Sequence, residues 1–184
     1  MSQLLQLRDA IIARIRAALP EFDVEGHYGR FDATELSRFV AKAPAARVAV
    51  LGLSDSSDGV DEDDLDTVAR IGVYVVTKDG VLKASRDAAV CAASEKIVLL
   101  AKGQRWGLTF CRPAAPAVAQ NLYSPESLNK GVAIWAIDIR QPVVLSAPEG
   151  AAEAPLTELY LGLAPKIGAA HVDDYLGPLP GDAA

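Results

Sequence analysis

Residues 130–145, KGVAIWAIDIRQPVVL, are the stretch that decides the fold. β-branched residues dominate it, and both faces of an extended chain are apolar here until Asp138 and Arg140. A strand that is apolar on both sides belongs in the middle of a sheet that is covered on two sides. Pro142 limits the hydrogen-bond ladder because it has no N–H to donate. The stretch therefore predicts a central strand of a layered α/β domain.

Further helices and strands are predicted from hydrophobic spacing and from turn signals along the rest of the chain. Helices are predicted over 2–19 and 86–101 and from Asp32 to just before Pro44, and strands over 47–53, 67–77 and 118–123. Residues 21–31 are expected to form a turn-rich connection. The elements together predict an α/β (α+β) fold with a mixed, largely antiparallel central sheet, flanked by two or three helices.

Size and composition predict one core-forming domain with an appendage. The chain has 184 residues, of which 51% are apolar and 23% charged. We expect a single α/β domain over 1–145, and a C-terminal extension over 146–184 that packs on the domain or on a neighbour. A short helix is expected at 156–163. The net charge of −6 argues against a general duplex-DNA binder, which needs clustered Lys and Arg.

The cysteines and the apolar runs indicate where the protein is made. Cys91 lies in an Ala-rich helical run, and both Cys91 and Cys111 are predicted to be buried free thiols, with a disulfide as the alternative. The N-terminus lacks the order of a signal peptide, and no apolar run approaches the ~20 residues that span a bilayer. We therefore expect the protein to be made in a cytoplasm.

The most unusual composition lies in residues 54–66, SDSSDGVDEDDLD, with six Asp and one Glu. Such a stretch cannot bury itself, so we predict a solvated loop at the tip of a long hairpin between two strands. An EF-hand calcium site is excluded, because a start at Asp55 puts Gly59 at loop position five and Val60 at six, where glycine is required. The plainer interpretation is that these charges keep a sheet edge or an assembly face from sticking.

No arrangement of residues for catalysis emerges from the sequence. Phosphate-cradling glycine loops and a nucleophile elbow are both missing. The two histidines are His27, in a polar turn, and His171, which precedes Asp173 and Asp174. One imidazole with two carboxylates is a weak metal signal. We predict no catalytic, metal or cofactor site, and no enzymatic activity.

Two stretches in the second half of the chain resemble a known family. The runs AAVCAASEKIVLLAKGQRWGL and NLYSPESLNKGVAIWAIDIRQPV resemble small proteins of Mu-like phages and prophages, encoded between the head–tail connector and the tail sheath or tube genes. The most specific cues are Arg105-Trp106-Gly107, residues 121–124 (NLYS) and residues 131–141. The N-terminal helix, VEGHYGRFDATELSRF and RVAVLGL fit the same pattern, so the resemblance covers roughly 5–145.

This resemblance implies a virion neck protein, the tail terminator. Such proteins are similar to small α/β domains that close into a hexameric ring on the tail tube and meet the head-completion protein. Double-stranded DNA passes through the lumen without specific binding, and no membrane is involved. Acidic side chains would then lie at the ring surface or lumen, where they repel DNA: Asp55, Asp58, Asp61, Glu62, Asp63, Asp64 and Asp66.

Three other functions stay open at this point. One is a head-completion or stopper protein of the same neck, which would bind the portal-side ring rather than the end of the tail tube. The second is a small enzyme with an unrecognised site, which would need a pocket that holds His27 or His171 beside carboxylates. The third is a monomeric acidic binding module.

Overall fold

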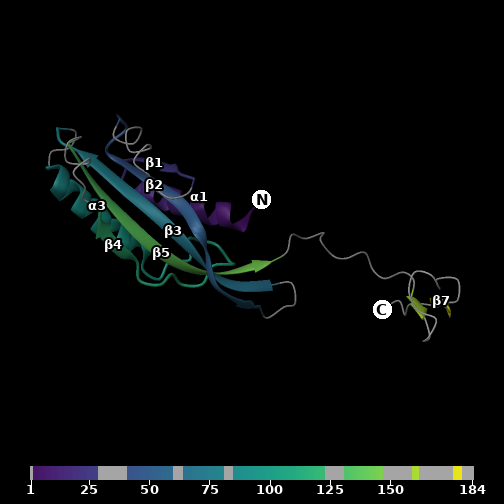
Figure 1. Ribbon diagram of the computed structural model, residues 1–184. Helices are drawn as coiled ribbons and strands as arrows, with labels where there is room; N and C mark the ends of the chain where they lie inside the picture. Colours follow the sequence, from purple (N-terminus) through teal and green to yellow (C-terminus); the bar gives the residue numbers. More distant parts are fainter. Residues whose placement is uncertain are drawn as a thin grey trace. The chain divides into compact units, whose positions relative to one another are not determined.

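The computed structural model describes residues 2–28, 41–59, 64–80, 85–122 and 131–146, and the backbone of 159–161 and 176–179. It divides into two compact units, residues 1–146 and 147–184. Unit 1 holds α1 (Gln3–Ala18), β1 (Asp23–Gly26), β2 (Ala45–Asp58), β3 (Asp64–Lys78), α3 (Arg86–Ala101), β4 (Val118–Asn121) and β5 (Val132–Ser146) (Figure 1). No described helix is long and apolar enough to cross a membrane.

A five-stranded sheet forms the body of unit 1, in the order β1-β2-β3-β5-β4. Only β1 and β2 pair in parallel, and the other three pairs are antiparallel. The mixed, largely antiparallel sheet is therefore confirmed. The stretch at 130–145 forms an interior strand, as predicted, but β3 is the middle strand, because it lies between its two longest partners, β2 and β5.

Both described helices pack on the same face of the sheet, which we call the helix face. Their apolar residues share one core with Ile71, Val73 and Val75 of β3 and with Ile137 and Ile139 of β5. The buried helix residues are Leu7, Ile11, Ile12 and Ile15 of α1, and Ala89, Val90, Ala93, Ser94, Ile97 and Ala101 of α3. The helix predicted from Asp32 lies almost wholly outside the described residues.

The opposite face, which we call the second face, has a smaller core of its own. Val76, Val132 and Ile134 are at most 4% exposed, and Ala43 and Leu122 pack against them. β5 thus has buried residues on both faces, which is the property that its sequence predicts. Toward its other end the second face becomes polar, from Asp138 to the exposed Arg140.

Helix and turn boundaries follow local chemistry. α1 ends at Ala18, just before Pro20, and α3 ends at Ala101, with Gly103 at φ +67° two residues on. Gly80, at φ +79°, forms the turn after β3.

Three predictions about local structure were wrong. Residues 23–26, expected within a connection, form edge strand β1, whose pattern has only one fully buried residue, Val24. The acidic stretch is mostly strand, because β2 continues to Asp58 and β3 begins at Asp64. In unit 2, the expected helix at 156–163 gives way to strand β6 (Leu159–Leu161), which pairs with β7 (Leu176–Leu179).

The cysteine prediction was half right. Both thiols are free, and Cys111 is buried, but Cys91 is exposed. The buried positions of α3 include 90, 93, 94 and 97, and a helix turns ~100° per residue, which carries Cys91 away from the sheet.

Candidate assembly surfaces

The first candidate surface is the end of the sheet that carries the acidic residues. We call it the arm, made of residues 52–58 of β2, 64–68 of β3 and 143–146 of β5, whose strands run on past α3 (Figure 1). β2 is partnered by β1 only as far as Val48, so its outer edge in the arm has no strand beside it among the described residues. A long free edge invites unwanted pairing with another chain.

The arm protects that edge by its own irregularities. The β2–β3 register shifts between Val50 and Gly52 and again between Ser54 and Ser57, and Asp55 between them has φ +53°. The hydroxyl of Thr67 donates to the Ser54 carbonyl oxygen (3.0 Å), which fixes the second shift. Bulges and charges are the usual means of keeping an edge from pairing.

The acidic residues do not form one uniform patch. Asp55 and Asp58 are exposed on β2, and Asp64 is half-buried where β3 begins. Asp66 is neutralised, because Arg112 Nη2 donates to both its carboxylate oxygens (2.7 and 2.8 Å). The sequence interpretation missed this role of Arg112. Asp61, Glu62 and Asp63 lie outside the described residues.

A buried polar contact joins the arm's base to the loop after α3. Trp106, itself at φ +57°, donates from Nε1 to Oε1 of Gln141 (2.7 Å), and the Gln141 amide nitrogen donates to the Arg112 carbonyl oxygen. Gln141 is fully buried and Trp106 is 7% exposed. Arg105-Trp106-Gly107 and the end of residues 131–141 were separate cues of the family resemblance, and here they meet.

The second candidate surface is a hollow of about 680 Å³ on the second face. Its lining includes Leu51 of β2, Val118 of β4 and Arg140 of β5. Arg70 and Asp138 also lie in it, joined by a hydrogen bond from Arg70 Nη2 to Asp138 Oδ2 (2.8 Å). That hydrogen bond and the charge of Asp138 raise the pKa of Arg70 above its ordinary value.

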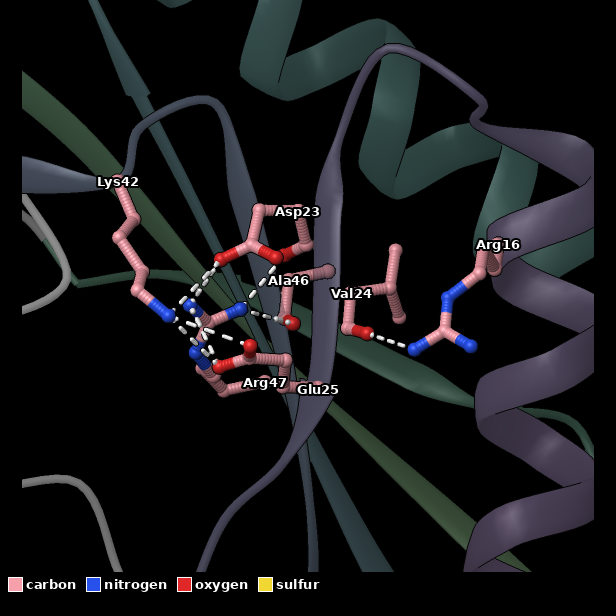
Figure 2. Close-up of polar contacts among 7 residues, drawn as sticks. All are labelled: Arg16, Asp23, Val24, Glu25, Lys42, Ala46 and Arg47. Carbon is pink, nitrogen blue, oxygen red and sulfur yellow. Dashed lines mark hydrogen bonds and ion pairs between the residues drawn. The ribbon is translucent and has the colours of Figure 1, made fainter.

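The β1 edge of the sheet is closed. Arg16 of α1 donates to the outward-facing carbonyl oxygen of Val24 (2.6 Å) (Figure 2). On the other side, Arg47 donates to the carbonyl oxygen and to a carboxylate oxygen of Asp23 (2.6 Å each), and it also lies near Glu25 (3.4 Å). The Arg47 side chain is only 3% exposed. These contacts hold β1 in place, and Arg16 occupies the outward-facing carbonyl oxygen at its centre.

The two histidines do not form a site with carboxylates in the described structure. His27 is buried, and its backbone N–H donates to the Val48 carbonyl oxygen (2.8 Å). His171 falls outside the described residues. The described part of the chain contains no cluster of His, Cys, Asp or Glu that would hold a metal ion. Burial raises the pKa of the Cys111 thiol to about 11, so this cysteine is unsuited to nucleophilic chemistry near neutral pH.

Comparison with known proteins agrees with the extent of unit 1. The family model described as "Bacteriophage Mu, Gp37" matches residues 3–143. The chain belongs to this family. The match runs from the first residue of α1 to residue 143 in β5, so it takes in every described strand and helix of unit 1 except the last three residues of β5. It confirms the resemblance to Mu-like phage proteins.

Other comparisons add little to the Gp37 family assignment. No curated protein matches the chain. A chain of a solved structure titled "Virion of native gene transfer agent (GTA) particle" is 16% identical, with a TM-score of 0.45, and the alignment covers 76% of this chain and 95% of that one.

Proposed function

We propose that this protein is a structural protein of the phage virion, the tail terminator of the neck. Copies of it form a ring, which we propose to be a hexamer, that caps the tail tube and joins it to the head-completion protein. The ring is assembled in the host cytoplasm and stays in the virion between head and tail. The observation that carries the proposal is the membership of residues 3–143 in the Gp37 family of Mu-like phages.

The geometry of unit 1 supports this role. A ring subunit needs a stiff core and two different surfaces for its two neighbours, because ring closure is a heterologous contact repeated around an axis. The sheet has a continuous core on its helix face, an arm at one end and a hollow on the second face. A heterologous contact between neighbouring subunits requires two such different surfaces on each copy.

The acidic hairpin has a role in the same proposal. Asp55, Asp58, Asp61, Glu62, Asp63, Asp64 and Asp66 lie at the rim or lumen of the ring, where negative charge repels DNA in transit. Because Asp66 is paired with Arg112, the hairpin tip is the part to change. The variant Asp61→Asn, Glu62→Gln, Asp63→Asn should assemble normally but deliver DNA more slowly. Unchanged DNA delivery by this variant would remove the acidic hairpin from the proposal.

Electron microscopy of the assembly tests the function directly. The purified protein is imaged by negative stain alone and after mixing with the tail-tube protein of the same phage. We expect rings at one end of each tube and an arrest of tube growth. Binding to the portal-side ring, with bare tube ends, would instead assign a head-completion role and overturn the terminator proposal.

A further inference from the structure

The arm exposes apolar side chains on its helix face, past the end of α3, although its β5 strand meets the start of α1, where the Ser146 N–H donates to the Gln3 side-chain oxygen (3.2 Å) (Figure 1). Leu53 pairs with Ala69 and Leu65 pairs with Asp58, and residues 65, 67 and 69 alternate onto one side of β3. Ala69 belongs to the helix-face core, so Leu53, Leu65 and Asp58 point to the same side. Leu53 is 41% exposed and Leu65 is 37% exposed. Leu65 lies directly opposite the exposed Asp58, and Leu53 lies further along the same side, opposite Ala69. The three side chains form an elongated surface suited to docking.

The hollow has the complementary chemistry on the opposite side of the sheet. Val118 at its edge is 67% exposed, and Leu51 lines it. Arg70 and Arg140 are direct cross-strand neighbours, an arrangement that is unfavourable for like charges. Asp138 compensates Arg70, whereas Arg140 is exposed and has no ion-pair partner among the described residues. The hollow thus combines apolar side chains with one uncompensated positive charge.

The edges of the sheet offer a poorer route to assembly. The outer edge of β1 is engaged by Arg16 of α1, and the free edge of the arm is bulged and acidic. β4 is an edge strand of only four residues. A copy that extended the sheet of the next copy through β4 would find no matching regular edge on its partner. Contact between faces is therefore favoured over continuous strand pairing.

We propose that the arm of one copy docks into the hollow of a second copy, with Leu53 and Leu65 against Val118 and Leu51, and Asp58 paired with Arg140. Because donor and acceptor surfaces lie on opposite faces of one sheet, each copy binds two neighbours and the contact is heterologous. The proposal rests on the ring assembly proposed above and specifies how neighbouring subunits recognise each other. Charge complementarity between Asp58 and Arg140 sets the register, and the apolar groups supply the buried centre.

Disulfide trapping tests the contact. In a Cys91→Ala background, Leu65→Cys and Val118→Cys are introduced together and oxidised with copper phenanthroline, which accepts the two electrons as two thiols become one disulfide. We expect a ladder of covalent multimers that dithiothreitol collapses. Leu65→Cys paired with Leu99→Cys is the matched control, because Leu99 is 65% exposed on α3, outside the hollow. No ladder, or equal ladders in both pairs, would overturn the proposal.

Charge reversal gives an independent test by sedimentation velocity, with and without tail-tube protein. Arg140→Glu or Asp58→Arg alone should weaken assembly by roughly tenfold or more, and the two together should restore it. Lys102→Glu and Glu95→Arg, at exposed positions of the α3 end and α3, should leave assembly unchanged. If the wild-type protein forms rings on tubes and neither charge reversal changes assembly, the docking proposal is refuted and the terminator function is not. A wild-type protein that fails to bind tubes would refute the terminator function.

Discussion

The contact between Trp106 and Gln141 should be among the most costly polar contacts to lose. Trp106→Phe removes the indole donor and leaves Gln141 Oε1 buried without a partner, which costs about 1–3 kcal/mol of unfolding free energy, and the lost ring volume costs roughly 1 kcal/mol more. Gln141→Leu leaves two groups unsatisfied, the indole N–H and the Arg112 carbonyl oxygen, and should cost about 2–4 kcal/mol.

The double variant separates the contact from general packing. When both partners are replaced by apolar groups, neither leaves the other buried without a hydrogen bond. The double variant should therefore lose about 1–2 kcal/mol less unfolding free energy than the sum of the losses in the two single variants. The free energies come from urea unfolding followed by far-UV circular dichroism, at two protein concentrations so that subunit dissociation does not contribute. Trp135→Phe with Gln141→Leu is the control. These residues lie on one strand about 20 Å apart, so their effects should add. Additivity within about 0.5 kcal/mol for Trp106 and Gln141 would refute the coupling.

Three further predictions concern the thiols and the β1 network. Because burial raises the pKa of Cys111 from 9.0 to about 11, its contribution to stability is complete below pH 9 and is lost between pH 9 and 11. The urea-derived unfolding free energy should fall there by roughly 1 kcal/mol per pH unit, and Cys111→Ala should remove that slope; an equal slope in both proteins would contradict this. Native protein should react with Ellman's reagent at Cys91 only, and Cys111 should react after denaturation, since only Cys91 is exposed; two fast thiols in the native state would show that the core around Cys111 opens. Arg47→Met should cost about 2–3 kcal/mol, because the buried Ala46 carbonyl oxygen and the part-buried carbonyl and carboxylate oxygens of Asp23 each lose a donor. Lys42→Met should cost under about 1 kcal/mol, since its ion pairs are exposed; equal losses in the urea series would argue against the buried network.

The long elements could be predicted because their local signals agree with the global fold. The Ala-rich run at Arg86–Ala101 and the β-branched runs of β3 and β5, which are apolar on both faces over most of their length, each bury enough apolar surface to fix their own type. β1 could not be predicted in the same way, since a four-residue edge strand with a single fully buried position has almost no periodicity. Its existence depends on Arg16 and Arg47, which come from elsewhere in the chain.

The acidic hairpin is a second feature that local composition predicted only in part. Composition correctly predicts that most side chains of β2 in this stretch are exposed, but it wrongly predicts a loop there. Strand pairing continues into the stretch, because backbone hydrogen bonds to β3 and the Thr67 hydroxyl hold residues whose side chains face water. The hollow could not be predicted from the sequence, although the acidic residues could be identified in it. Arg140 and Val118 are 22 positions apart in the chain, and they line the same hollow because β4 pairs with β5.

The sequence by itself determined the class of fold, the two long helices and the hairpin around the acidic residues, because a local pattern of apolar and polar residues specifies each. It also carries the motifs, such as Arg105-Trp106-Gly107, by which the chain resembles its family. The tertiary structure alone decided which face of the sheet the helices cover, which carboxylate Arg112 neutralises, and where unpaired surface remains. Those properties depend on strand register and on contacts between residues far apart in the chain, and a shift of one residue in register would move every side chain to the other face.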